Sequence, residues 1–172
     1  MCYIGDKMLR EKCKPVKEIT PEIRRIAEEL IQTMQAHNGL GLAAPQIGYA
    51  LRMFAIQISD EIDEENYPMD APPQVFINPI ITRFSKEKVV LSEGCLSIPG
   101  LHEDVIRPQC IDFEALDIDG NPFIQKELKY WRSRCIQHEC DHLDGVLFID
   151  RLPSILKKKH DAELKIIEAK FK

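Results

Sequence analysis

Residues 130–145 read YWRSRCIQHECDHLDG, and the rest of the chain can be interpreted outward from this segment. It reads as a helix that ends at Asp144-Gly145. At about 100° per residue, His138 and His142 lie about 40° apart around the helix axis, so both imidazoles can reach one metal ion. Glu139 lies beside the ion without binding it. The segment therefore has the His-Glu-x-x-His pattern of metal-dependent hydrolases.

An alternative interpretation is an ordinary amphipathic helix. Trp131, Cys135, His138 and His142 share one face of the predicted helix, so core packing alone explains part of the pattern. The chain has only five histidines, however, and two of them stand at ligand spacing around a glutamate. This coincidence favours the metal site over the amphipathic helix.

A catalytic metal site of this type needs a third protein ligand and one open coordination position. Cys95, in EGCLS at residues 93–97, is the best candidate. It follows a predicted strand and lies among turn residues, where a thiolate can point into a cleft. A lone cysteine is more often a buried thiol, but Gly94 and Ser97 argue against a continuous apolar strand here.

The composition is that of an ordinary globular protein. Of the 172 residues, 44% are hydrophobic and 30% are charged. No apolar run approaches the roughly 18 residues needed to cross a bilayer, and the start MCYIGDK lacks the apolar core of a secretory signal. We therefore expect a cytoplasmic protein whose six cysteines are free thiols or metal ligands. The net charge of −5 gives no reason to expect specific DNA binding.

Helices and strands alternate irregularly along the chain. Thr20-Pro21 opens a helix that Asn38-Gly39 ends, residues 93–100 look turn-like, and Asp119-Gly120 predicts a hairpin turn. We expect residues 59–73 to form an exposed loop. The predicted strands cover residues 51–58, 75–81, 86–91, 110–117 and 122–128.

This order of elements predicts an α+β fold, with mixed or antiparallel strands around a central metal-binding helix. An N-terminal helix and a C-terminal helix, the latter from about residue 153 to residue 172, complete it. No internal repeat or linker divides the sequence. We therefore expect residues 1–172 to form a single catalytic domain.

Residues 39–46, GLGLAAPQ, are ambiguous by themselves. They lack the glycine spacing and the Gly-Lys-Ser/Thr ending of nucleotide-binding loops. The segment is either a tight turn that allows close packing or a backbone that approaches an extended peptide. In the second case Gln46 offers an amide side chain to the ligand.

Three segments, GLGLAAPQ at residues 39–46, EGCLS at 93–97 and QHECDHLDG at 137–145, occur in this order. They resemble the three signature motifs of peptide deformylases. The similarity extends to SIPG at residues 97–100 and to Arg107-Pro108, so it spans nearly the whole chain. The helical tail resembles the subgroup typical of Gram-negative bacteria and organelles. The resemblance implies a metal-dependent hydrolase that removes the formyl group from the N-terminal methionine of newly synthesised proteins and releases formate.

The resemblance also implies roles for individual residues. Cys95, His138 and His142 would hold a divalent ion, with ferrous iron expected from the family and zinc, nickel or cobalt compatible with the ligands. Glu139 would accept a proton from the attacking water and pass it to the departing amine. The side-chain N–H of Gln46 and the backbone N–H of Leu96 would donate hydrogen bonds to the oxyanion of the tetrahedral intermediate.

Substrate contacts follow from the same resemblance. The peptide backbone would bind in extended form along Leu40, Gly41 and the segment that begins at Glu93, as an added strand. An apolar pocket would take the methionine side chain, and its expected lining residues are Trp131, Arg134 and Cys135.

Two other classes of function compete with this interpretation. A zinc endopeptidase would need a downstream Glu or His as third ligand, and His160, Glu163 and Glu168 all lie in the basic tail, which is a poor place for a ligand. A non-enzyme alternative is a structural zinc module or an inactive peptide-binding relative. A structural site is closed by four protein ligands, and Cys140 would be the candidate for the fourth, whereas Glu139 favours catalysis. Cys140 lies two residues from His138 and points to a different helix face.

The C-terminal segment differs from the rest of the chain in the sign of its net charge. Residues 151–172 carry a net charge of +4, whereas the other 150 residues carry −9. Leu156, Leu164, Ile167 and Phe171, joined by His160, form one face of the predicted tail helix. The basic residues of the opposite face recur every seven positions and are Lys158, Lys165 and Lys172. We expect this basic stripe to dock on the ribosome, since deformylases act on emerging chains and a phosphate-rich surface attracts lysines.

Overall fold

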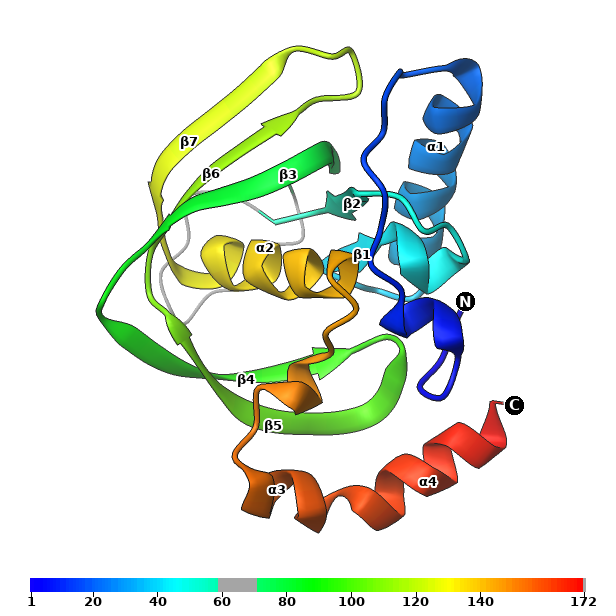
Figure 1. The fold of residues 1–172 in the computed structure, drawn as a ribbon, viewed down its shortest axis with the longest axis vertical. Coiled ribbons are helices and arrows are strands. Elements are labelled where there is room, and N and C mark those ends of the chain that lie inside the picture. The colour runs from blue at the N-terminus through cyan, green and yellow to red at the C-terminus, as the bar shows by residue number, and fades with distance from the viewer. Residues whose placement is uncertain (59–70, 172) are drawn as a thin grey trace.

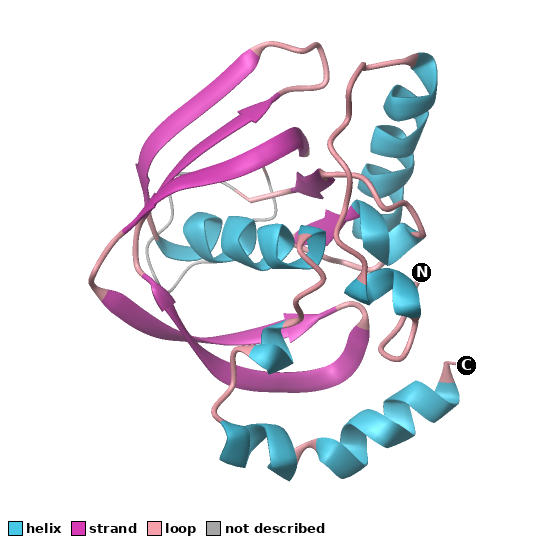
Figure 2. Cartoon of the chain, in the orientation of Figure 1, coloured by secondary structure: helices cyan, strands magenta, loops and turns pink. Residues whose placement is uncertain are grey.

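Helix α2 (Tyr130–Leu143) runs through the middle of the molecule, between two antiparallel sheets (Figure 1). The structure is a computed structural model that describes residues 1–58 and 71–171. The predicted loop at residues 59–73 therefore falls largely outside the described residues. The predicted α+β class is confirmed, and Figure 2 shows helix α2 among the strands with the other long helices at the periphery.

The larger sheet has the strand order β1-β2-β3-β6-β7, and the smaller one pairs β4 with β5. All of these pairings are antiparallel. The strands are β1 (Gly41–Ala43), β2 (Met53–Ile56), β3 (Gln74–Phe84), β4 (Lys88–Cys95), β5 (Ile98–Pro108), β6 (Ile111–Leu116) and β7 (Pro122–Leu128).

The two sheets are joined by one curved two-stranded ribbon. Strand β3 leads into β4, and β5 leads into β6, so the pairing of β3 with β6 continues as the pairing of β4 with β5. Between them the Ser85 N–H donates to Cys110 O at 2.8 Å, and the Gln109 N–H donates to Glu87 O at 2.9 Å. The ribbon bends around α2 and brings its far end, the turn between β4 and β5, next to the C-terminal half of that helix (Figure 1).

The prediction of a turn over residues 93–100 was wrong in its extent. Strand β4 continues to Cys95, and β5 begins again at Ile98, so only Leu96 and Ser97 form the turn. Strand β5 escaped prediction because it contains Pro, Gly and several charged residues, which have low strand propensity. Its cross-strand pairing with β4 and the burial of Leu101 and Val105 outweigh that propensity.

Helix α1 (Pro21–Ala36) begins and ends as predicted. The Thr20 side chain accepts a hydrogen bond from the Ile23 N–H, and the chain leaves the helix through Asn38, which has a positive φ. The apolar face of α1 packs on the side of the large sheet opposite α2. The core between that sheet and α2 is built from aromatic and aliphatic side chains, among them Phe54, Phe76, Phe113, Ile136 and Leu143.

The predicted single C-terminal helix is instead two helices, α3 (Ser154–Lys159) and α4 (Asp161–Lys170). His160 joins them with φ −93° and ψ −1°, away from ideal helical values. Its buried imidazole meets Glu103 of β5, with 2.7 Å between Nε2 and Oε2, and this contact holds the joint against the sheet. Among the described residues, no helix is long and apolar enough to cross a membrane.

Candidate metal centre and catalytic cleft

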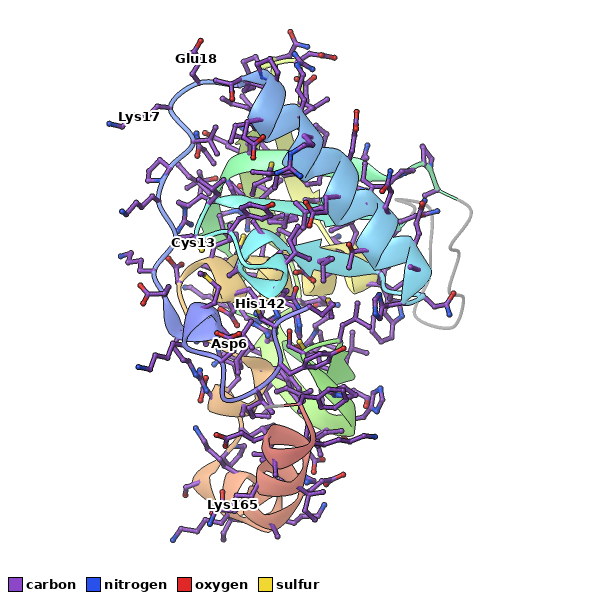
Figure 3. All side chains as sticks on the ribbon, turned by 90° about the vertical axis from the view of Figure 1, so that its right-hand side faces the viewer. Asp6, Cys13, Lys17, Glu18, His142 and Lys165 are labelled. Atoms are coloured by element: carbon purple, nitrogen blue, oxygen red, sulfur yellow. The ribbon has the colours of Figure 1, made fainter. Side chains whose placement is uncertain are left out.

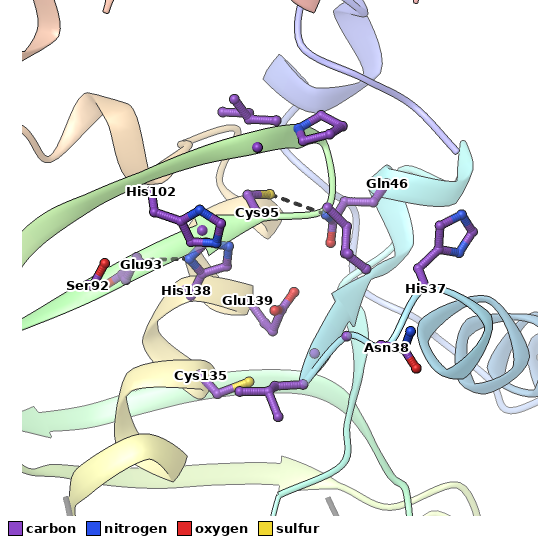
Figure 4. A pocket seen from close by; sticks show the side chains of 18 of the residues that line it. His37, Asn38, Gln46, Ser92, Glu93, Cys95, His102, Cys135, His138 and Glu139 are labelled. Carbon is purple, nitrogen blue, oxygen red and sulfur yellow. Dashed lines mark hydrogen bonds and ion pairs between the residues drawn. The ribbon is translucent and has the colours of Figure 1, made fainter. Parts of the chain in front are cut away.

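Cys95, His138 and His142 converge where the β4–β5 turn meets α2. Each offers one ligand atom, and these atoms lie within 4.8 Å of one another. The Cys95 Sγ is 3.3 Å from the Nε2 of His142. The two histidines lie on one face of α2, as their spacing predicts, and the end of β4 supplies the cysteine. Figure 4 shows His138 on α2 and Cys95 on β4 in the wall of the pocket. A thiolate with two imidazoles is a donor set that suits a divalent transition-metal ion.

Glu93 fixes the orientation of His138. Its Oε2 lies 2.9 Å from the Nδ1 of His138, so this nitrogen carries the proton and the other one faces Cys95. Arg107 donates two hydrogen bonds to the Glu93 carboxylate, at 2.6 and 2.9 Å, and Arg134 donates a third at 2.8 Å. Burial alone would raise the pKa of Glu93, but these partners outweigh it and lower the pKa well below the usual range.

The two histidines have opposite electrostatic surroundings. Burial disfavours the charged form of His138, but hydrogen bonds with Cys95 and Glu93 outweigh it and raise its pKa well above the usual value. Burial, with repulsion from His138 and Arg107, lowers the pKa of His142, which therefore stays a neutral imidazole.

Glu139 lies beside the three ligands and is almost fully buried, at 3% exposure. Its Oε2 has no hydrogen-bond partner among the described residues. Burial raises its pKa to about 7, which suits a group that takes up and releases a proton near neutral pH. A Cβ at Gly41 would overlap the Glu139 carboxylate and lie 2.8 Å from the Cys135 sulfur. Only glycine at position 41 leaves room for this carboxylate.

The Gln46 amide is held rigidly next to Cys95. Its Oε1 accepts a hydrogen bond from the Ala43 N–H at 2.8 Å, and its Nε2 donates to Ser97 Oγ at 3.0 Å. The same Nε2 donates to Cys95 Sγ at 3.5 Å (Figure 4). Leu96 follows Cys95 in the turn between β4 and β5. Both residues therefore border the space in front of the three ligands.

A cleft of about 620 Å³ opens onto this site. Its wall includes the predicted substrate-binding residues Leu40, Gly41, Glu93, Trp131, Arg134 and Cys135. Cys135 is buried and Trp131 is partly buried against the core, so these two contribute apolar surface from α2.

The polar groups of Arg134 face into the protein. Its guanidinium donates to Glu93 and to the carbonyl oxygens of Val105 and Val89, each within 2.9 Å. Arg134 therefore ties α2 to both strands of the β4–β5 hairpin. Its hydrogen bonds and those of Glu93 are made within the protein rather than toward the open cleft.

Sequence reasoning gave no role to Ser97, Arg107 and Asp141. Ser97 accepts from Gln46, and Arg107 donates to Asp141 at 2.7 Å as well as to Glu93. Ser97 and Asp141 stand inside the recognised motifs, where their place was a usable signal. Arg107 lies on β5, which the sequence does not predict, so the family resemblance marked the residue but no pattern indicated that its side chain points inward.

The residues that the competing interpretations require lie elsewhere. Cys140 is buried in the core on another side of α2 and does not belong to the ligand group. His160 and Glu163 contact each other on the C-terminal helices, and His160 is engaged with Glu103. Among the described residues, Cys95 alone joins the two histidines as a third ligand.

Comparison with known proteins agrees with this geometry. Residues 1–158 match the family described as polypeptide deformylase. A peptide deformylase of Picosynechococcus sp. is 48% identical over 152 residues, which cover 87% of this chain and 76% of the relative.

Solved structures give the same result. The crystal structure of peptide deformylase from Ehrlichia chaffeensis superposes with a TM-score of 0.86 and 35% identity, covering 98% of this chain and 96% of that one. A second structure of the Ehrlichia enzyme, in complex with actinonin, has a TM-score of 0.84 and 38% identity, and the match covers 96% of this chain and 94% of that chain.

Proposed function

This chain belongs to the peptide deformylase family, and on that premise we propose that Cys95, His138 and His142 hold the divalent metal ion of a hydrolase that removes the formyl group from N-terminal methionine. The reaction releases formate and leaves a free amine on the newly synthesised protein. The observation that carries the residue assignment is the convergence of three ligand atoms beside the buried, unpartnered carboxylate oxygen of Glu139.

The residues present fit a metal ion. One thiolate and two imidazoles leave a net positive charge on a divalent ion, and three protein ligands leave a position open. An ion held there supplies a Lewis acid that polarises the formyl carbonyl and lowers the pKa of a water molecule toward neutrality.

Glu139 is the proton carrier in this proposal. Its carboxylate accepts a proton from the attacking water and then delivers it to the amine that departs from the formyl carbon. A carboxyl group with a pKa near neutrality can do both. The fixed Nε2 of Gln46 and the backbone N–H of Leu96 donate hydrogen bonds to the oxyanion that forms on the formyl oxygen.

The peptide lies in the cleft in extended form. We infer that Leu40 and Gly41 offer backbone groups on one side and that the segment around Cys95 offers them on the other, as in strand addition. Cys135 and Trp131 line the apolar space for the methionine side chain. Glu93 and Arg134 also line the cleft and remain proposed substrate contacts, and Glu93 in addition positions His138.

We further propose ferrous iron as the ion, the cytoplasm as the compartment and the ribosome as the docking partner. The ligand set also accepts zinc, nickel or cobalt, so the ion is a matter for elemental analysis. The ribosome proposal rests on the outer side of the C-terminal helices, where Lys158 and Lys165 are exposed. Lys165 lies at the end of the molecule away from His142 (Figure 3). Lys172, the third residue of the predicted stripe, falls outside the described residues.

The test of the main proposal is formate release from formyl-methionyl peptides by protein purified anaerobically with iron. The same peptides without the formyl group serve as the control. Formate release with an intact peptide bond is the expected result. Cleavage inside unblocked peptides would instead indicate an endopeptidase, and metal binding without either reaction would indicate an inactive relative.

A further inference from the structure

Two aromatic rings from opposite ends of the chain stack beside the catalytic cleft. The ring centroids of Tyr3 and Phe171 are 4.0 Å apart, and the ring planes are inclined by 18°. Both residues line the same cleft as Gln46 and Cys95. Figure 1 shows the two termini on one side of the molecule, close to the turn that joins β4 to β5.

The backbone around Tyr3 is bound to both loops that carry the proposed oxyanion donors. The Cys2 N–H donates to Gln46 O at 2.7 Å, and the Ile4 N–H donates to Ser97 O at 2.9 Å. Residues 2–4 thus bridge the first motif and the β4–β5 turn. The position of Tyr3 is therefore fixed by hydrogen bonds to the backbone of Gln46 and Ser97, beside the cleft.

Helix α4 brings Phe171 to this place. Leu164 and Ile167 are buried in a cluster that includes Leu9 and Leu147. Gly5 has a φ of +96°, and a Cβ there would lie 2.7 Å from the Cδ of Glu168, so the end of α4 lies directly against residues 3–5. The C-terminal helix is therefore packed on the catalytic domain in a way that fixes the ring pair.

The ring pair keeps surface open to a ligand. Phe171 is still 37% exposed although Tyr3 covers one of its faces. The Nζ of the exposed Lys170 lies 5.4 Å from the centroid of the Phe171 ring, on a flexible side chain that a ligand can displace. An exposed aromatic surface at the edge of a peptide-binding cleft is suited to another apolar side chain.

Resting on the deformylase function proposed above, we infer that the Tyr3–Phe171 pair is a subsite for an apolar or aromatic side chain downstream of formyl-methionine. The pair would select among substrates without touching the reacting atoms. The C-terminal helix then has a part in substrate choice, because it carries one of the two rings.

The inference is tested with formyl-Met-Ala-Ala-Ala and three peptides in which Phe replaces the second, third or fourth residue. For the wild-type protein we expect Phe at one downstream position to lower KM by about 3- to 10-fold, as expected for an added aromatic contact. In Phe171→Ala that advantage should disappear while kcat on formyl-Met-Ala-Ala-Ala stays unchanged. Phe171→Leu should retain part of the advantage.

Ile166→Ala is the matched control, because Ile166 is 70% exposed on the same helix and does not line the cleft. It should keep the wild-type preference, and metal content and Tm should verify that all variants are folded. A Phe advantage that persists in Phe171→Ala, or a change that is equal for all four peptides, would overturn the subsite. Wild-type formate release without any preference would also overturn it, whereas no release from any peptide would contradict the deformylase function itself.

Discussion

At the scale of single residues, the metal-facing side chains depend on a buried network of charges. Glu93 contacts His138, Arg107 and Arg134, and Arg107 also contacts Asp141. Charges inside a protein are costly unless they are paired and hydrogen-bonded. Here each contact also fixes geometry, since the orientation of His138 follows from its bond to Glu93. The network therefore joins the stability of the molecule to the precision of the site.

Removing one member of this network should lower the stability of the protein strongly. We expect Arg107→Leu to lower the free energy of unfolding by about 3–5 kcal/mol, because Glu93 and Asp141 lose a buried cation. The matched control is Arg83→Leu, which breaks a pair with Asp112 in which the arginine is 45% exposed and should change the stability far less, because solvent screens the pair. Urea unfolding measures both, and equal costs for the two variants would contradict the proposed importance of the network.

The proposed ligands make a second prediction. Cys95→Ala, His138→Ala and His142→Ala should each lose metal and activity together, because two remaining ligands hold a divalent ion poorly. Elemental analysis and formate release are the measurements. Cys110→Ala, which removes a buried thiol outside the ligand group, should keep both. A variant that retains one metal ion per chain would remove the mutated residue from the ligand set.

Glu139 should separate metal binding from turnover. Glu139→Ala and the isosteric Glu139→Gln are expected to keep the ion and to lose about 10²–10⁴-fold in kcat, the usual contribution of a general acid–base group. Metal content and kcat are compared in the same preparations. Near wild-type turnover at full metal occupancy would place the proton carrier elsewhere.

At the scale of elements, Asp150 connects the start of the C-terminal helices to the N-terminal segment, in addition to the His160–Glu103 contact. Asp150 accepts hydrogen bonds from the Arg10 side chain, from the Leu147 N–H at 2.9 Å and from the Lys157 Nζ at 2.7 Å. The N-terminal segment and the start of the C-terminal helices thus meet at one carboxylate. Burial opposes its ionisation, but these partners outweigh burial and lower the pKa of Asp150 to about 2.

This lowered pKa predicts a pH-dependent contribution to stability. An unfolded Asp has a pKa of about 3.9, so the contribution is fully present above pH 4 and is lost as pH falls toward about 2. We expect Asp150→Asn to cost about 1–2 kcal/mol at pH 7, allowing for the partial exposure of its partners. In urea unfolding the difference from wild type should shrink between pH 4 and pH 2. A difference that does not change with pH would mean that packing, not charge, is lost.

At the scale of the whole molecule, charge is distributed unevenly. The tail of residues 151–172 is basic and the other 150 residues are acidic. The structure packs the buried side of α4 against β5 and leaves Lys158 and Lys165 exposed. The apolar face expected from the sequence is confirmed for Leu164 and Ile167, which are buried.

The ribosome proposal predicts a loss of docking without a loss of catalysis. Lys158→Glu with Lys165→Glu should reduce co-sedimentation with ribosomes at low salt, because phosphate contacts depend on cationic side chains. Activity on a short formyl peptide should stay unchanged. Lys86→Glu with Lys126→Glu makes the same charge change on exposed strand and loop positions and should not affect docking. If both double variants reduced co-sedimentation equally, docking would depend on the net charge of the protein and not on the basic stripe.

The sequence by itself determined the local features of this protein. The caps and apolar periodicity of α1, the extent of α2, the hairpin turn at Asp119-Gly120 and the spacing of the two histidines all depend on residues close together in the chain. Such patterns follow from helix geometry and turn chemistry, which act over a few residues. Motif order added the family and supported Cys95 as the proposed third ligand, although no periodicity could place it beside α2.

Only the tertiary structure decided the features that join distant residues. Strand β5, with low propensity, exists because it pairs with β4 and buries its inner side chains. The break at His160 exists because its imidazole meets Glu103 on β5. The stacking of Tyr3 on Phe171 and the contacts of Arg107 with Glu93 and Asp141 likewise need the completed fold. These contacts link residues up to 168 positions apart. Local sequence patterns do not show which distant residues come into contact in the fold.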